Sequence, residues 1–197
     1  LYYTGYFDAA TSFRHALFQT VSIASTTGFA SSDFNLWPDF SRYVLLLLMF
    51  VGGCSGSTAG GMKVSRFVIL LKVTWAELRR TIHPRLVYSI KMGGRNVPPV
   101  VVGNVTRFFY LYMIVFSTLT LLISLTGISM LDSMGIIAAC MSSVGPAFGI
   151  VGPTATYADV STFGRLVVIA AMILGRLEIF TLLIIMRPDF WRVKRNW

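Results

Sequence analysis

The most restrictive feature of this sequence is an uncharged run of 24 residues from Phe108 to Leu131. As an α-helix, such a run is long enough to cross a hydrocarbon core of about 30 Å. Of the 197 residues, 55% are hydrophobic and only 13% are charged, whereas a soluble domain carries about 25% charged residues. The composition therefore predicts a membrane protein. It excludes a disordered chain, a disulfide scaffold and an ordinary cytosolic enzyme.

The basic residues that give the net charge of +9 gather in two segments, 72–107 and 187–197. Each segment contains a single acidic residue, Glu77 in the first and Asp189 in the second. Cytoplasmic loops of membrane proteins carry this excess of lysine and arginine, so we expect both segments on the cytoplasmic side. Topology alone explains the charge, and we expect no nucleic-acid binding. Docking of an acidic or nucleotide-binding partner on these segments stays open.

Two further apolar stretches are interrupted near their middle. The stretch 43–71 is broken by the Gly-rich run 52–61, and the stretch 166–186 is broken by Arg176 and Glu178. A shorter amphipathic segment precedes each of them, at 11–25 and at 133–142, and ends in a Gly-containing turn. A short helix, a turn and a full helix are typical of a re-entrant pore loop. Non-helical backbone at membrane depth persists only where protein buries it or where it lines water.

An internal repeat relates these two parts of the chain. Phe40-Ser41-Arg42 matches Phe163-Gly164-Arg165, and counting 11 residues on from each arginine reaches Gly53 and Arg176. The link from the turn glycine to this arginine is 14 residues in the first unit and 20 in the second. The six extra residues are expected as an outer-loop insertion near 152–158.

The predicted fold is an all-α membrane protein built from repeated helix–pore-loop–helix units. Residues 1–78 would form one unit that lacks its first helix, and 104–186 a complete unit. Residues 79–103 would be a cytoplasmic linker and 187–197 a cytoplasmic basic tail. The chain is thus expected to be a piece of something longer.

The turn glycines, Gly28 and Gly145, suit a filter for a monovalent cation. Such a filter replaces the ion's hydration shell with backbone carbonyls, and glycine lets the chain turn its C=O groups inward. Hydroxyls of Thr26, Thr27 and Ser143 can add oxygens, and the helix C-terminus directs negative partial charge at the pore. The alternative is that both are ordinary turns.

The run from Gly52 to Gly61 predicts a helix that unwinds near the middle of the bilayer. It lacks the Gly-Lys-Ser/Thr of a phosphate loop, since Lys63 follows Met62, and it lacks the Gly-x-Ser-x-Gly of a hydrolase. A flexible loop inward of a filter can act as a gate, and a close-packing kink is the alternative. The predicted gate residues are Gly52, Gly53, Cys54, Ser55, Gly56, Ser57, Thr58, Ala59, Gly60 and Gly61.

Arg176 is expected at the same depth as this loop. A charge at the bilayer centre costs at least about 2.5–3.5 kcal/mol, so it normally faces the interior with a partner. Unpaired carbonyls of the loop are the expected partner, because Glu178 lies roughly 200° around the helix. A structural arginine that pairs with Glu178 of a neighbouring element is the alternative. In a pore, Arg176 would also repel cations.

Four motifs together resemble the Trk/Ktr/HKT superfamily of potassium transporters. They are Thr-Thr-Gly-Phe, Gly-Gly-Cys-Ser-Gly-Ser-Thr-Ala-Gly-Gly-Met-Lys, Val-Gly-Pro and Gly-Arg-Leu-Glu-Ile-Phe-Thr. The resemblance implies a potassium-channel-like pore of four repeats, of which this chain holds the third without its first helix and the fourth. It implies a filter formed by Thr26, Thr27, Gly28, Phe29, Ser143, Val144, Gly145 and Pro146. Ser143 departs from the family, which often has asparagine there.

The resemblance also implies partners. In this superfamily two such subunits form a homodimer in the lipid bilayer of the cell inner membrane, and a cytosolic nucleotide-binding regulatory ring of the TrkA type controls opening. Potassium is the transported ion, held by filter carbonyls, and no cofactor is expected in this chain. Two quarters cannot close a pore, so the fragment alone should not conduct.

Three other functions were weighed against potassium transport. A Na⁺ or mixed Na⁺/K⁺ transporter of the same superfamily stays open, because the first two filter quarters are absent. A non-conducting structural subunit would not need two turn glycines in repeat positions. An intramembrane enzyme would pair Ser55 or Ser57 with His83, which lies in the basic segment, so no enzyme is expected. The sequence shows no cluster of metal-binding residues. Cys54 and Cys140 are expected to be buried packing residues.

Overall fold

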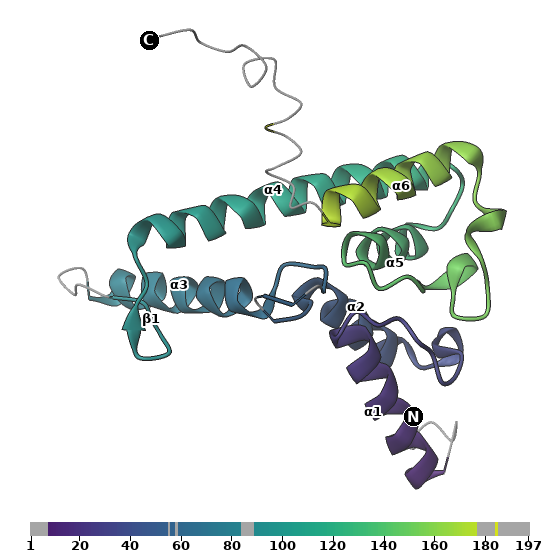
Figure 1. The fold of residues 1–197 in the computed structure, drawn as a ribbon, viewed down its shortest axis with the longest axis horizontal. Coiled ribbons are helices and arrows are strands. Elements are labelled where there is room, and N and C mark those ends of the chain that lie inside the picture. The colour runs from purple at the N-terminus through teal and green to yellow at the C-terminus, as the bar shows by residue number, and fades with distance from the viewer. Residues whose placement is uncertain (1–7, 55, 58, 84–88, 177–183, 185–197) are drawn as a thin grey trace, which may run out of the picture.

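The computed structural model describes residues 8–54, 56–57, 59–83, 89–176 and 184. In these residues the chain is predominantly helical, as the sequence predicts, with one small hairpin (Figure 1). The helices are α1 (Ala9–Ala24), α2 (Asp39–Val51), α3 (Val64–Ile82), α4 (Pro99–Ser124), α5 (Met130–Met141) and α6 (Thr162–Arg176). Three 3-10 turns are η1 (Phe34–Leu36), η2 (Gly149–Val151) and η3 (Tyr157–Asp159). The hairpin pairs β1 (Lys91–Met92) with β2 (Arg95–Asn96).

The short helix α5 forms the centre of the described structure. It packs against α4 and α6 on one side and against α2 on the other (Figure 1). Every residue from Ile136 to Met141 is at most 1% exposed. Ser129 begins the helix by accepting a hydrogen bond from the Asp132 N–H, as N-cap serines do. A helix that is apolar on all faces is stable only inside protein or lipid, so α5 is a buried helix and not a surface one.

The uncharged run at 108–131 is not a single helix. Its main part belongs to α4, which begins earlier, with Pro99 at its first turn, and ends at Ser124. Proline suits the first helical turn because its missing N–H would have no partner there. Gly127, at φ +85°, turns the chain away before α5 begins. In the described part of the chain, α4 is the helix long and apolar enough to cross a membrane.

The predicted short helices and the interruption after the first of them are present. Helix α1 corresponds to the expected segment 11–25 and α5 to 133–142, while α2 stops at Val51 and α3 starts only at Val64. With 13 residues, α2 is about 20 Å long and does not span a bilayer by itself. Glu178, all but one residue of 179–186, and the tail 187–197 lie outside the described residues.

The segment between the two units is more structured than a plain linker. Helix α3 continues through Ile82 and α4 already begins at Pro99, so both ends of the expected 79–103 linker are helical. Between them, Gly93 and Gly94 adopt φ of +56° and +78° and form the two-residue turn of the hairpin. The Lys72 ammonium donates to the Lys91 carbonyl at 2.6 Å and ties α3 to this hairpin.

The outer loops of the two units show where the six extra residues lie. Phe34 and Tyr157 each open a 3-10 turn, five residues before α2 and α6 begin, and they are 123 residues apart. Arg42 and Arg165 have the same separation. The turn η3 therefore corresponds to η1. The six extra residues therefore lie between Pro146 and Tyr157, in a segment that contains η2 and overlaps the expected 152–158.

Asn35 joins the two outer loops. Its amide nitrogen donates to the Gly149 carbonyl at 3.2 Å, and the Gly149 N–H donates to its amide oxygen at 2.9 Å. Beside this pair, the rings of Phe34 and Phe148 meet edge to face at 5.4 Å between centroids. The side-chain amide of Asn35 thus bonds to both backbone groups of Gly149, and these two hydrogen bonds fix the distance between the loops.

Replacing Asn35 with alanine is expected to loosen this connection. Two hydrogen bonds are lost and the Gly149 N–H loses its partner, so the free energy of unfolding should fall by about 1–3 kcal/mol. Denaturant unfolding of the full-length subunit in detergent measures the change. Asn96→Ala on the exposed hairpin is the matched control and should change little. An Asn35→Ala variant as stable as the control would contradict this role.

Candidate functional site

The two Gly turns have the same backbone conformation. Thr26 and Ser143 adopt φ of +57° and +56°, and Gly28 and Gly145 adopt φ of +78° and +104°. Each pair is 117 residues apart. Positive φ at threonine and serine is uncommon and is a sign of a constrained segment. The predicted repeat is thus present in backbone geometry, at positions where the side chains differ.

The hydrogen bonds that end the two short helices are also equivalent. The Thr27 N–H donates to the Ser22 carbonyl at 2.9 Å, and the Val144 N–H donates to the Ala139 carbonyl at 2.9 Å. One residue earlier, Thr26 N–H reaches the Ile23 carbonyl at 3.0 Å, as Ser143 N–H reaches the Cys140 carbonyl at 3.1 Å. All of these bonds join backbone groups. The way each turn begins therefore follows from the way its helix ends.

The structure brings the two turns into contact. A Cβ added at Gly28 would overlap the Val144 carbonyl oxygen and lie 3.2 Å from the Pro146 side chain. The Ser22 hydroxyl, on α1, holds the end of the first turn by donating to the Phe29 carbonyl at 2.6 Å. The backbones of the two turns, which are far apart in the sequence, thus lie side by side.

The Gly-rich loop between α2 and α3 closes on itself. Gly52, at φ +67°, ends α2. The Met62 N–H then donates to the Phe50 carbonyl at 3.3 Å and the Val64 N–H to the Gly53 carbonyl at 3.0 Å. The helix is therefore interrupted here, as predicted. Ser55 and Thr58 lie outside the described residues. Cys54 is exposed, so the expectation that it is buried is wrong, whereas Cys140 is buried as expected.

The loop packs directly on the end of α5. A Cβ at Gly60 would overlap the Ser142 carbonyl, and the Ser142 hydroxyl donates to the Met49 carbonyl of α2. The last carbonyls of a helix have no partner within the helix, and here a side chain of the neighbouring segment supplies one. The loop and the second turn are thus parts of one structure.

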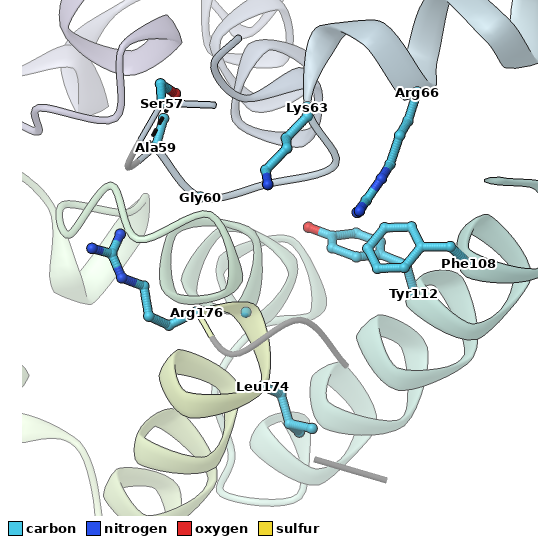
Figure 2. Close-up of a pocket in the computed structure, with 11 residues that line it drawn as sticks. Ser57, Ala59, Gly60, Lys63, Arg66, Phe108, Tyr112, Leu174 and Arg176 are labelled. Carbon is cyan, nitrogen blue, oxygen red and sulfur yellow. Dashed lines mark hydrogen bonds between the residues drawn. The ribbon is translucent and has the colours of Figure 1, made fainter. Parts of the chain in front are cut away.

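A cavity of about 160 Å³ lies between the loop, α4 and α6 (Figure 2). Its basic lining residues are Lys63, Arg66 and Arg176, and its described lining contains no acidic residue. The guanidinium of Arg66 lies 4.2 Å from the centre of the Phe108 ring, a cation–π contact that stabilises a charge away from water. The charged side chains in the described lining of this cavity are thus all basic.

Arg176 lies between the loop and the second turn. Besides the cavity that it shares with Ser57, Ala59 and Gly60, it lines a second hollow together with Ser143 and Gly145. The equal depth expected for Arg176 and the loop agrees with this common cavity. Its predicted partners in the loop and its predicted role stay hypotheses.

Several residues of this site were not identified from the sequence. Lys63 and Arg66 add to the charge of the cavity, Ser142 holds the end of α2, and Tyr157 contacts the second turn. If the two units are aligned on Arg42 and Arg165 and the alignment is extended toward the N-terminus, Tyr157 falls opposite Phe34. No sequence signal connects Ser142 to Met49, because that contact depends on tertiary packing.

Two Gly turns of the same conformation, an interrupted helix and a membrane-length helix are typical of a membrane transport protein. A profile described as "TrkH: Cation transport protein" matches residues 3–192, and the chain belongs to this family. It is 45% identical over 190 residues to the Trk system potassium uptake protein TrkH of Vibrio parahaemolyticus, covering 96% of this chain and 38% of that protein. TrkH of Escherichia coli K12 is 40% identical over 187 residues, covering 95% of this chain and 38% of that protein.

The crystal structure of the potassium transporter TrkH from Vibrio parahaemolyticus has the same fold. It superposes with a TM-score of 0.86 at 44% identity, covering 95% of this chain and 40% of that chain. The all-α membrane architecture is therefore confirmed. The chain spans about two fifths of the length of these relatives.

The contact between the turns predicts different outcomes for their two glycines. Gly28→Ala should reduce the thermal stability strongly, because its Cβ would meet the Val144 carbonyl in a left-handed conformation. At Gly145 no described heavy atom lies within 4 Å of an added Cβ, so Gly145→Ala should cost only the backbone strain of about 1–3 kcal/mol. Melting curves of both variants in detergent make the comparison. Equal losses would exclude the close approach at Gly28.

Proposed function

We propose that this chain supplies two quarters of a filter for K⁺ in the membrane subunit of a Trk-type uptake system. The observation that supports this most directly is that Thr26–Phe29 and Ser143–Pro146 share one backbone conformation and meet at Gly28 and Val144. Repeated turns that converge are what a ring of carbonyls around one axis requires. The names of the relatives, potassium uptake proteins of the Trk system, agree with this proposal.

Transport through such a filter needs no covalent chemistry. Backbone carbonyls replace the hydration shell of K⁺, and a membrane potential of about 100 mV supplies about 2.3 kcal/mol per charge for inward movement. No cofactor enters this mechanism, and K⁺ is the transported ion. The protein acts as a transporter and not as an enzyme.

Gly52–Gly61 and Arg176 form the gate in this proposal. The loop lies against the second turn through Gly60 and Ser142, and Arg176 lines cavities on both sides of that contact. With Lys63 and Arg66 it makes the path below the filter positive, which opposes the passage of a cation. Opening then requires the loop and the arginine to move away from the path.

The complete subunit works as a homodimer in the cell inner membrane, with a TrkA-like nucleotide-binding ring on the cytoplasmic side. The basic residues of α3 and of the hairpin lie on that side and suit such a partner. The fragment holds only half of the filter, so the other repeats must complete the pore. A transporter that accepts Na⁺, or both ions, is the alternative.

Gly145→Ser tests the filter. The added side chain enters open space at a turn whose backbone conformation favours glycine, so it should spoil the discrimination of K⁺ from Na⁺. Rb⁺ uptake, with Na⁺ as competitor, is measured in cells that lack their own K⁺ uptake systems and express the full-length subunit together with its cytosolic ring. We expect selective uptake by the parent and a selectivity reduced tenfold or more in the variant.

Three results decide this test. Intact selectivity in a well-inserted Gly145→Ser variant would remove this turn from the filter. Uptake by the parent that Na⁺ suppresses as well as K⁺ does would favour the Na⁺ or mixed alternative. No uptake by a parent that is correctly inserted and bound to its ring would overturn the pore itself.

Arg176→Ala tests the gate. A full charge about 10 Å from the path repels a cation by about 1.7 kcal/mol at an effective dielectric constant of about 20. Its removal should therefore raise Rb⁺ flux by roughly tenfold. Arg165→Ala, at the exposed outer end of the same helix, is the matched control and should leave the flux unchanged. An unchanged flux in a normally folded Arg176→Ala variant would exclude the gate role.

A further inference from the structure

The carbonyl of Gly145 accepts a hydrogen bond from a side chain outside its own segment. The hydroxyl of Tyr157, at the start of η3, donates to it at 2.7 Å. The sulfur of Cys140, on α5, lies 3.4 Å from the same hydroxyl. A tyrosine hydroxyl has one hydrogen, and here it is directed at the carbonyl, so the thiol is the donor to the tyrosine oxygen. Cys140, Tyr157 and Gly145 thus form a chain of two hydrogen bonds.

This chain of hydrogen bonds persists under ordinary conditions. Burial raises the pKa of the Tyr157 hydroxyl, so it keeps its proton and continues to donate. Cys140 is 1% exposed and held within the core around α5. Pro146 follows Gly145 and has no N–H, so the peptide between them offers only the carbonyl for anchoring. The hydroxyl of Tyr157 is therefore well placed to set the rotation of that peptide.

The first unit lacks this device. In the repeat register, Ile23 takes the place of Cys140 and Phe34 takes the place of Tyr157. Both are fully buried, at 1% and 0% exposure, and neither can donate a hydrogen bond. Two buried apolar residues of the first unit thus occupy the positions at which the second unit has a hydrogen-bonded pair. The two turns therefore differ in the residues that surround them, and not in their glycines.

We propose that Tyr157, supported by Cys140, is a positioning residue that fixes the orientation of the Gly145 carbonyl and thereby contributes to ion selectivity. This inference rests on the proposed filter function. In the fourth filter segment the glycine carbonyl is then directed by a side chain from outside the segment, whereas in the third the Ser22 hydroxyl donates to the carbonyl of Phe29, after the glycine. Loss of the hydroxyl frees the Gly145–Pro146 peptide to rotate, so the oxygens presented to a bare ion become less uniform.

Tyr157→Phe tests the proposal, because it removes one oxygen atom and keeps the ring. The ratio of Rb⁺ to Na⁺ uptake should fall roughly two- to tenfold, the range that corresponds to one buried hydrogen bond. The amount of inserted subunit should stay unchanged. Tyr110→Phe, on the exposed side of α4, is the matched control. Cys140→Ser keeps a donor to Tyr157 and should preserve the ratio, whereas Cys140→Ala should reduce it partially.

A measurement that needs no transport tests the hydrogen bonds themselves. The infrared S–H stretching band of Cys140 is isolated by subtracting the spectrum of Cys140→Ala, and it should move to higher wavenumber in Tyr157→Phe, because the thiol loses its acceptor. If Tyr157→Phe fails to insert, the double variant Cys140→Ile, Tyr157→Phe gives this site the side chains of the first unit. It should fold and show the same reduced selectivity.

The outcomes separate this inference from the function on which it rests. A selective parent with a less selective Tyr157→Phe or double variant supports both. A selective parent whose variants keep the full ratio overturns the role of Tyr157 and leaves the filter in place. An S–H band that does not move overturns the support of Tyr157 by Cys140. A correctly inserted parent without Rb⁺ uptake in the presence of its ring overturns both.

Discussion

The described structure depends on three glycines whose backbone lies in close contact with the C-terminal end of α5 and the turn that follows it. Gly28, Gly60 and Gly175 come from three separate segments, and each lies so near the carbonyls at 141–144 that a Cβ would overlap one of them. Contacts of this kind hold a first turn, the interrupted loop and the last described helix around a single point. The buried part of α5, from Gly135 to Met141, is packed against α2, α4 and α6, which fix its position. The membrane-length helix α4 supports this centre and does not form it.

The sequence was most informative where one physical rule dominates. Absence of charge revealed the membrane segment, and the Gly-rich run revealed the break between α2 and α3. Hydropathy does not register the turn at Gly127, so the uncharged run does not show where α4 ends. The bonds of Asn35 and Ser142 were out of reach, since they join residues 114 and 93 positions apart.

The charges of this site are held in different ways at similar depth. Arg66 lies on the Phe108 ring, where the electron-rich face partly replaces water, while Arg176, on α6, lines two cavities. Between them, the Gly-rich loop is joined at its ends by hydrogen bonds from Met62 and Val64. The interruption is thus held at the two points where it leaves α2 and enters α3.

The hydrogen bonds with which the two turns begin run from backbone to backbone, and this has a consequence for the way in which the two units can differ. Their side chains change without disturbing these bonds, as Val144 in the place of Thr27 and Pro146 in the place of Phe29 illustrate. What the two units share is a main-chain shape and not a set of residues. Each unit has its own outer support, Ser22 in the first and Tyr157 in the second, so turns of the same shape lie in chemically distinct surroundings.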